Sequence, residues 1–351
     1  MTRVDSRPPP ATRSSRPPPL VLEQPALPPL VEAVNLTKEF RVERRLFARS
    51  RYLHAVEDVT FNILPGETVG LVGESGSGKS TLGRLLLRLL EPSFGQVRFD
   101  GTVITQLTDR ELRPLRRKMQ MVFQDPYSSL NPRMTVERIV GEPLRVHHLV
   151  NGDQQMREKV SGLLQRVGLA AENIDRLPHE FSGGQRQRVG IARALAAAPS
   201  FIVCDEPTSA LDVSIQAQII NLLLDLQEQA NLTYLFISHD LGVVQAVSHR
   251  VMVMYLGRIV EIAPTAALFS ASQHPYTRAL LSAVLQPDPT RRRLRLVVEG
   301  EPPSPIDPPP GCAFHPRCPR ALAGRCNQEV PTLSEIVPGS GHFVACFNPH
   351  G

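Results

Sequence analysis

A glycine-rich loop between an apolar run and a helical pattern constrains the fold of this chain more than any other feature. Residues 73–81 read Gly-Glu-Ser-Gly-Ser-Gly-Lys-Ser-Thr and fit the pattern G-x-x-x-x-G-K-[ST]. They follow the apolar run at 68–72 and lead into a helix that we expect to begin near Lys79. This strand–loop–helix context is the one in which the pattern binds phosphate groups. The alternative, a glycine-rich turn that binds nothing, is disfavoured by that context.

The loop carries groups suited to the phosphates of a nucleotide and to a magnesium ion. Its glycines let backbone N–H groups approach phosphate oxygens at the start of a helix. Lys79 supplies a cation to the β- and γ-phosphates, and the Ser80 hydroxyl is a ligand for Mg²⁺. The residues expected to bind the nucleotide here are Gly73, Ser75, Gly76, Gly78, Lys79, Ser80 and Thr81.

Two adjacent acidic residues follow a second apolar run, at 201–204. A buried strand that ends in a carboxylate places it where a doubly wound sheet binds its ligands. Asp205 is therefore expected to hold Mg²⁺ through water, and Glu206 to orient and deprotonate an attacking water. A helix N-cap is the alternative for this pair. Cys204 is expected to be a small buried residue rather than a ligand.

Short apolar runs with helical patterns between them predict an α/β domain with a largely parallel sheet. Apolar residues recur at helical spacing from Leu82, from Val160 and from Ile219. We expect this domain to span residues 31–270, after a disordered Pro/Arg-rich tail at 1–30. The expected strands lie at 30–34, 59–63, 68–72, 96–99, 119–123, 201–204, 234–237 and 251–255.

A third motif identifies a family. Residues 181–188 read Phe-Ser-Gly-Gly-Gln-Arg-Gln-Arg, and with them the chain resembles the ATPase subunits of ABC transporters. The resemblance implies a RecA-like core with antiparallel β and α-helical subdomains. It also implies that this motif faces the ATP of an opposite subunit, so that two nucleotides are sandwiched at a dimer interface. The residues that would contact that ATP are Ser182, Gly183, Gly184 and Gln185.

The same resemblance assigns roles to four further residues. Gln124 matches the glutamine that senses Mg²⁺ and the membrane partner, and Asp212 lies in a loop that crosses the dimer interface. His239 matches the residue that contacts the γ-phosphate. Phe40 falls where the family places an aromatic ring on adenine, with Tyr52 as a rival. The expected catalytic residues are thus Glu206, His239 and Gln124, and the expected Mg²⁺ ligands Ser80, Gln124 and Asp205.

Three further segments, at 124–132, 274–281 and 300–305, resemble the dipeptide/oligopeptide importer branch of the family. Within that branch, residues 125–133 and 51–56 resemble the F-type ATPase subunit rather than its D-type partner. The resemblance implies ATP hydrolysis that powers peptide uptake. It also implies a second, D-type ATPase subunit, two membrane permease subunits and an extracytoplasmic peptide-binding protein. Dipeptides, oligopeptides, glutathione and nickel remain open as the transported solute.

Four cysteines crowd the last forty residues, separated by five, seven and nineteen residues. Free thiols, a disulfide, zinc or an iron–sulfur cluster are all compatible with this spacing. The resemblance favours a [4Fe–4S] cluster, with zinc as the alternative. The expected ligands are Cys312, Cys318, Cys326 and Cys346. They lie in an expected Cys-rich extension at 311–351, after a linker and C-terminal helix at 271–310.

Composition separates the remaining function classes. The formal net charge is +5, and 35 of the 39 basic residues are Arg, which is a weak electrostatic argument for nucleic acid. A nucleic-acid ATPase of the same superfamily is the alternative, but tandem ATPase domains and a long coiled-coil insertion are missing from the sequence. A regulatory module without turnover is disfavoured by Glu206 and His239. Without an apolar run of eighteen residues, or the apolar core of a secretory signal, we expect a peripheral protein on the cytoplasmic face of the inner membrane.

Overall fold

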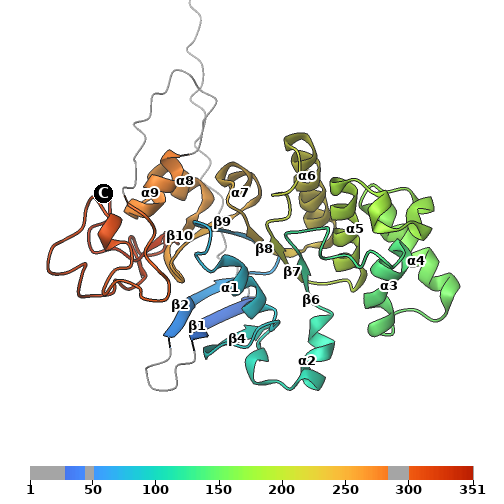
Figure 1. Ribbon diagram of the computed structural model, residues 1–351, viewed down its shortest axis with the longest axis horizontal. Coiled ribbons are helices and arrows are strands. Elements are labelled where there is room, and N and C mark those ends of the chain that lie inside the picture. The colour runs from blue at the N-terminus through green and yellow to red at the C-terminus, as the bar shows by residue number, and fades with distance from the viewer. Residues whose placement is uncertain (1–27, 44–50, 284–299, 351) are drawn as a thin grey trace, which may run out of the picture.

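The computed structural model describes residues 28–43, 51–283 and 300–350. Most of the expected tail, and residues 284–299 of the expected linker, lie outside the described residues. Two sheets form the centre of the molecule (Figure 1). The first is antiparallel, in the order β2-β1-β4-β5, with β1 Val31–Glu43, β2 Arg51–Ile63, β4 Phe94–Phe99 and β5 Thr102–Val103.

The second sheet is mixed and follows the order β11-β12-β10-β9-β3-β8-β7-β6. From β9 to β6 its strands pair in parallel, and β10, β12 and β11 pair antiparallel. The parallel strands are β3 Thr68–Val72, β6 Met119–Val122, β7 Phe201–Asp205, β8 Thr233–Ile237 and β9 Arg250–Tyr255. The antiparallel strands are β10 Arg258–Pro264, β11 Ser334–Glu335 and β12 Phe343–Val344.

Helices cover the mixed sheet and form a lobe beside it (Figure 1). In chain order, they are α1 Lys79–Leu86, α2 Asp109–Arg116, α3 Val136–Val146, α4 Asp153–Arg166, α5 Gly183–Ala196, α6 Val213–Ala230, α7 Leu241–Val247, α8 Thr265–Ala271 and α9 Pro275–Ser282. Short 3₁₀ helices lie at 104–106, 171–175, 178–180 and 315–317. The lobe consists of α3, α4 and α5, whose apolar faces share one core.

Side chains of the central strands alternate between two cores. In β7, Phe201 and Val203 pack in the core that includes the antiparallel sheet, whereas Ile202 and Cys204 pack in the core that includes the helical lobe. Successive residues of a strand point to opposite faces, so a strand covered on both faces is apolar throughout. This explains why β3, β7 and β8 are continuous apolar runs in the sequence, and Cys204 is fully buried as expected.

Each of the eight expected strands is present in the structure, several of them longer than expected. The sequence prediction omitted β5, β10, β11 and β12. Of these, β10 follows β9 through a two-residue turn in which Leu256 has φ 43° and Gly257 φ 80°. Such a turn with two positive φ angles joins antiparallel strands, which are not expected from an alternation of strands and helices.

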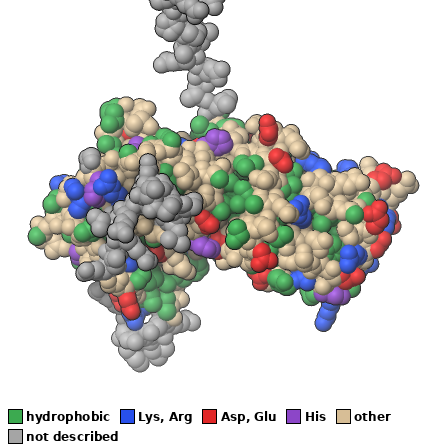
Figure 2. Space-filling model, turned by 90° about the horizontal axis from the view of Figure 1, so that it is seen from above, with side chains coloured by type: hydrophobic (Ala, Val, Ile, Leu, Met, Phe, Trp, Pro, Cys, Tyr) green, Lys and Arg blue, Asp and Glu red, His purple; other side chains and the backbone are tan. Residues whose placement is uncertain are grey.

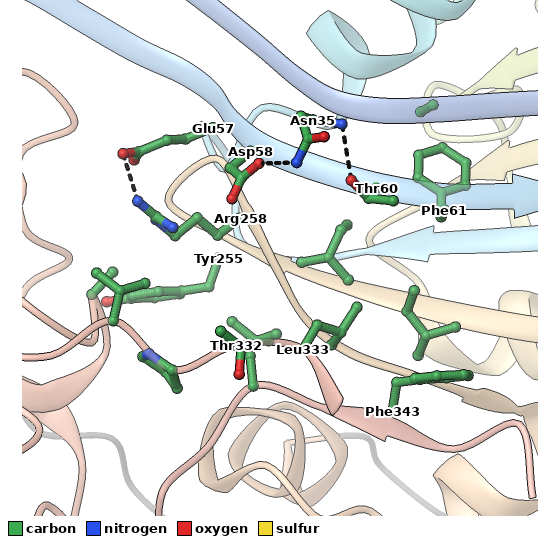
Figure 3. Close-up of a pocket in the computed structure, with 18 of the residues that line it drawn as sticks. Asn35, Glu57, Asp58, Thr60, Phe61, Tyr255, Arg258, Thr332, Leu333 and Phe343 are labelled. Carbon is green, nitrogen blue, oxygen red and sulfur yellow. Dashed lines mark hydrogen bonds and ion pairs between the residues drawn. The ribbon is translucent and has the colours of Figure 1, made fainter. Parts of the chain in front are cut away.

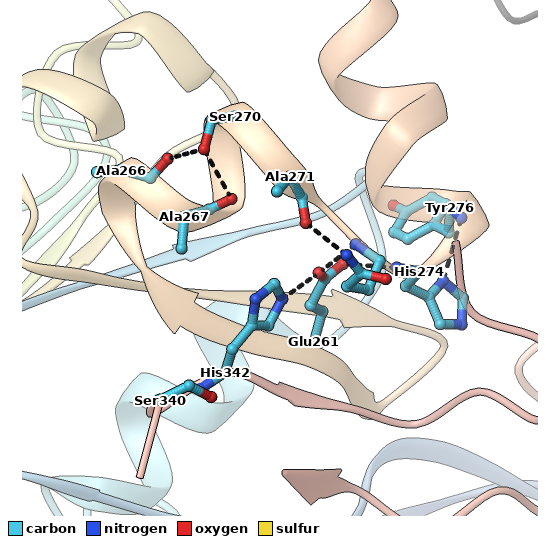
Figure 4. Close-up of polar contacts among 10 residues, drawn as sticks. Glu261, Ala266, Ala267, Ser270, Ala271, His274, Tyr276, Ser340 and His342 are labelled. Atoms are coloured by element: carbon cyan, nitrogen blue, oxygen red, sulfur yellow. Dashed lines mark hydrogen bonds and ion pairs between the residues drawn. The ribbon is translucent and has the colours of Figure 1, made fainter. Parts of the chain in front are cut away.

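The C-terminal segment continues the mixed sheet. Strand β12 pairs with β10, so the sheet extends well beyond residue 270, where the sequence prediction ended it. Figure 4 shows His342, just before β12, pointing toward Glu261 of β10, and its Nε2 lies 2.7 Å from Oε1 of that carboxylate. Glu261 is fully buried. The C-terminal segment is therefore held to the body by the pairing of β12 with β10 and by a buried hydrogen bond.

The surface is mixed in charge. On the face seen in Figure 2, basic and acidic side chains are interspersed among polar and apolar ones. Among the described residues, no helix combines the length and the apolar character needed to cross a bilayer.

Candidate functional site

The phosphate loop joins β3 to α1, which begins at Lys79 as expected. Gly73 has φ 154° and Gly78 has φ 102°, values that favour glycine. A Cβ on Gly78 would lie 2.0 Å from the carbonyl oxygen of Ala55 in β2, and one on Gly73 would lie 2.1 Å from that of Met254 in β9. The loop is therefore held between two strands that approach its backbone directly.

The Lys79 side chain folds back onto the loop. Its Nζ donates hydrogen bonds to the carbonyl oxygens of Gly73 at 2.8 Å and Glu74 at 2.9 Å. Burial lowers the pKa of Lys79, although the carboxylates of Glu206 and Asp205 oppose this shift. The ammonium group is thus partly desolvated and held by two neutral carbonyls, which anionic phosphate oxygens can replace.

Ser80 and Asp205 meet beneath the loop. The Ser80 hydroxyl donates to Oδ1 of Asp205 at 2.8 Å, and only 1% of Asp205 is exposed. Burial raises the pKa of Asp205, against the hydrogen bond from Ser80. A hydroxyl and one carboxylate fit Mg²⁺, because this ion is usually bound by one or two carboxylates together with substrate phosphates.

Glu206 lies at the point where β7 ends. Its φ of 45° is left-handed, while its N–H still donates to Ile237 of β8. Oε2 of Glu206 accepts a 2.8 Å hydrogen bond from the Gln124 side chain and lies 3.4 Å from Nδ1 of His239. The structure thus brings the three expected catalytic residues together. The His239 side chain is 63% exposed, so this edge of the site is open.

These groups share one edge because of the strand order. The phosphate loop follows β3, Gln124 follows β6, Asp205 and Glu206 end β7, and His239 follows β8. The four strands are parallel neighbours in the order β3-β8-β7-β6. Their carboxyl ends therefore meet, which is where open α/β sheets bind ligands.

The 182–185 motif begins α5, at a distance from this cluster. Ser182 and Gln185 form a capping box, in which the Ser182 hydroxyl accepts from the Gln185 N–H and the Gln185 side chain accepts from the Ser182 N–H. Gly184 lies against Ile215, near the start of α6, which Asp212 precedes. The side-chain hydrogen bonds that Ser182 and Gln185 make among the described residues are with each other. In the part of the chain that the structure describes, these bonds therefore do not connect the motif with the phosphate loop.

The two adenine candidates lie on neighbouring strands but on opposite faces. Phe40 of β1 pairs with Leu53, and Tyr52 of β2 pairs with Arg41. Because side chains alternate along a strand, the rings of Phe40 and Tyr52 point to different sides. Ala55, three residues beyond Tyr52, contacts the phosphate loop. Only one of the two rings can therefore face a nucleotide bound at the loop.

The four C-terminal cysteines are free thiols that lie close enough to influence one another's charge. Burial raises the pKa of Cys346 to about 11. A backbone N–H contacts each sulfur: Phe314 and His315 donate to Cys312, Arg320 to Cys318, Leu322 to Cys326 and Asn348 to Cys346. Among the described residues, however, no three His, Cys, Asp or Glu side chains come close enough to hold a metal ion. The described residues therefore support neither the expected [4Fe–4S] cluster nor the alternative of zinc.

Glu74 and its partners in the C-terminal part of the chain belong to no motif that predicts a role for them. The Glu74 N–H donates to the Tyr276 hydroxyl at 2.9 Å, and its carboxylate accepts from Nη1 of Arg317 at 3.1 and 3.2 Å. Tyr276 lies within the 274–281 segment that resembles peptide importers, and this resemblance could have marked Tyr276 as a functional residue. Arg317 is 243 residues from Glu74, and nothing in the local sequence points to the pair.

A cavity of about 760 Å³ lies elsewhere, between the antiparallel sheet and the C-terminal segment. Figure 3 shows Glu57, Asp58 and Asn35 on one side of it, and Leu333 and Phe343 on the other. None of residues 73–81 lines it. It is therefore separate from the phosphate site.

Comparison with known proteins places the chain in a family. Residues 56–209 match the ABC transporter family, and residues 260–326 match the family described as "Oligopeptide/dipeptide transporter, C-terminal region". The probable peptide ABC transporter ATP-binding protein y4tS of Sinorhizobium fredii is 54% identical over 318 residues, which are 90% of this chain and 89% of the relative. The oligopeptide transport ATP-binding protein AppF of Bacillus subtilis is 50% identical over 321 residues, 90% of this chain and 96% of the relative.

Solved structures agree. A dimeric ATP-binding cassette, MJ0796, in a post-hydrolysis state bound to ADP and Pi, is 31% identical with a TM-score of 0.60, and the match covers 67% of this chain and 98% of that chain. The P-loop ABC ATPase fold is therefore confirmed. The chain belongs to the ABC transporter family, as an ATP-binding subunit of peptide importers, and hydrolyses ATP to power peptide import.

Proposed function

We propose that this subunit hydrolyses ATP at a composite site, in which its phosphate loop faces the 182–185 motif of a second ATPase subunit. The observation that carries this proposal is the connected cluster of Lys79, Ser80–Asp205 and Gln124–Glu206 at one sheet edge. The 182–185 motif has its own anion-binding geometry at the start of α5, yet its polar contacts are local. A second subunit would complete the site.

The geometry supports a separate role for each residue in ATP hydrolysis. Lys79 exchanges its two carbonyl partners for phosphate oxygens, and the glycine-rich backbone holds those oxygens in place. Ser80, Asp205 and Gln124 would hold Mg²⁺, which would supply positive charge to neutralise the phosphates. Glu206 accepts a proton from the water that attacks the γ-phosphorus, while Gln124 and His239 fix its carboxylate. His239, exposed at the open edge, is placed to contact the γ-phosphate.

Replacing Glu206 with Gln tests the base. The amide keeps the shape of the side chain but cannot accept the proton, so hydrolysis should fall by about 10²–10⁴-fold with ATP affinity retained. We expect this variant, with ATP, to associate with its partner subunit in size-exclusion chromatography. Adding Ser182→Arg should abolish that association while ATP still binds. Near-normal turnover by Glu206→Gln would remove Glu206 as the base, and association that survives Ser182→Arg would remove the composite site.

The subunit composition of the transporter is the next part of this proposal. The expected label of F-type ATPase subunit is the wrong term for this chain, which is an ATP-binding subunit of the peptide importer family. We propose that it works beside a second, D-type ATPase subunit, with two permease subunits, a peptide-binding protein and a position on the cytoplasmic face of the inner membrane. The likeness to AppF supports an oligopeptide or dipeptide as the cargo. Purification of the complex from its native membrane, with identification of every subunit, tests this composition. Recovery without a second ATPase would overturn the D-type partner.

We also propose that the four cysteines hold a [4Fe–4S] cluster. The backbone N–H group beside each sulfur supports this, because such hydrogen bonds stabilise the thiolates that ligate iron–sulfur clusters. Anaerobic purification with iron, sulfide and zinc analysis decides the matter. Four titratable thiols with no metal would refute the cluster.

A further inference from the structure

Two residues from the C-terminal part of the chain contact the phosphate loop. Glu74, the second residue of the loop, is held by two groups from beyond residue 270, the Tyr276 hydroxyl and the Arg317 guanidinium. The carbonyl oxygen of Glu74 is also one of the two partners of Lys79 Nζ. A single residue therefore connects the extension with the cation that binds the phosphates.

Contacts other than the one with Glu74 also hold Arg317 in position. It ends the 3₁₀ turn His315–Arg317, and its backbone N–H donates to Phe314. Phe314 is 1% exposed and packs against Tyr255 and Tyr276, with ring centroids 5.3 and 5.4 Å away. Nη1 of Arg317 also lies 3.3 Å from the Tyr255 hydroxyl. An aromatic cluster thus aims the guanidinium at the loop.

The charges explain what the contact does. Glu74 puts a carboxylate into a loop that must receive a polyanion, and 29% of its side chain is exposed. An unpaired carboxylate there would repel the phosphates, more strongly than in water because the site is partly buried. Arg317, with only 8% of its side chain exposed, pairs with this charge and neutralises it. It also fixes the position of the Glu74 backbone, whose carbonyl oxygen contacts Lys79.

We propose that Arg317 is a positioning residue for ATP, which pairs with Glu74 and so allows the phosphate loop to accept the triphosphate. The extension thereby acts on nucleotide affinity and not only on stability. This inference rests on the proposed ATP site at Lys79. It adds a residue that touches neither nucleotide nor metal and acts only through the loop.

Arg317→Gln should weaken ATP binding by about tenfold, within the range for loss of a charge-assisted hydrogen bond. The KM for ATP should rise while kcat changes less than about twofold, because Glu206 and its partners are untouched. Arg317→Lys should restore part of the affinity, since it returns the charge without the forked geometry. Adding Glu74→Gln to Arg317→Gln should restore most of it, because the repelling charge is then gone.

The experiment measures ATP affinity and steady-state kinetics of the full-length protein. Arg325→Gln is the matched control, since Arg325 lies in the same extension and pairs with the exposed Glu329. Lys79→Ala should abolish binding in every background, and if it does not, the proposed ATP site itself is wrong. If Lys79→Ala abolishes binding but Arg317→Gln matches Arg325→Gln, the inference alone is wrong. Failure of Glu74→Gln to restore affinity in the Arg317→Gln background would likewise overturn it, since a purely structural loss is not repaired by removing a charge.

Discussion

Glu206 and the loop glycines hold left-handed backbone angles at the site. For a residue with a side chain, such as Glu206 at φ 45°, this conformation costs on the order of 1–3 kcal/mol. Here it turns the chain sharply out of β7, so that the carboxylate points along the sheet edge toward Gln124 and His239. The strain is offset by the hydrogen bonds of its backbone to Ile237 and Ser209.

Two loop glycines provide a matched pair of substitutions. Gly78→Ala would set a Cβ against the Ala55 carbonyl, whereas a Cβ on Gly76 would have no atom within 4 Å. Both glycines have positive φ, so both changes carry the roughly 1 kcal/mol strain of a left-handed alanine. Only Gly78→Ala should also displace the loop and weaken ATP binding by more than about tenfold, as measured by nucleotide titration. Equal losses in the two variants would contradict this account.

At the scale of the element, the β1–β2 ribbon decides which aromatic ring can meet adenine. Phe40 and Tyr52 lie one residue apart in the ladder and on opposite faces, so the register permits one and excludes the other. A cation lies over each ring, Lys38 over Phe40 at 5.1 Å and Arg41 over Tyr52 at 5.9 Å. Each ring is therefore already covered by a cation. Which of the two can stack on adenine depends on the face of the ribbon that the nucleotide approaches.

We expect Phe40→Ala to weaken ATP binding by about 1–3 kcal/mol, the usual value of a stacked base, and Tyr52→Ala to leave it unchanged. Both variants should bind inorganic triphosphate equally, since that ligand has no base. Isothermal titration with the two ligands makes the comparison. The reverse result would assign adenine to Tyr52, and a loss of triphosphate binding would indicate damage to the loop instead.

At the scale of the whole molecule, the buried contacts of Glu261 fasten the extension to the ATPase body. Its carboxylate accepts from His342 and from the backbone N–H groups of Gln273 and His274 (Figure 4). Burial by itself raises the pKa of Glu261, but these hydrogen bonds bring it below its ordinary value. His274, beside it, caps α9 by accepting from the Tyr276 N–H. Burial lowers the pKa of His274 to about 4.

Stability should therefore fall on acidification. Between pH 6.5 and about 4, unfolded chains bind a proton at His274 that the folded protein does not, so the free energy of unfolding decreases by up to about 3 kcal/mol across this window. Below about pH 4, the free energy of unfolding decreases further, because the lowered pKa of Glu261 lets unfolded chains bind a proton there that the folded protein does not. His274→Asn keeps an N-cap acceptor and removes the titration, so denaturant melts of this variant should depend less on pH. An unchanged pH profile would show that another group is responsible.

Much of the fold follows from local pattern. Strands covered on both faces are apolar throughout, so β3, β7 and β8 are readable as runs, and the amphipathic spacing of α1, α4 and α6 is equally local. Strand β10 was missed because a hairpin breaks the alternation of strand and helix. The two-residue strands β11 and β12 are too short to carry a pattern of their own.

Local sequence patterns were enough to predict the phosphate loop, the acidic pair after β7 and the residues that follow β6 and β8, because each is a motif attached to the end of a strand. Parallel strand order then brings those ends together. The contacts of Glu74 with Arg317 and of Glu261 with His342 depend instead on the fold. These pairs join residues 243 and 81 positions apart, and such contacts are set by the path of the chain in space, which no local spacing records.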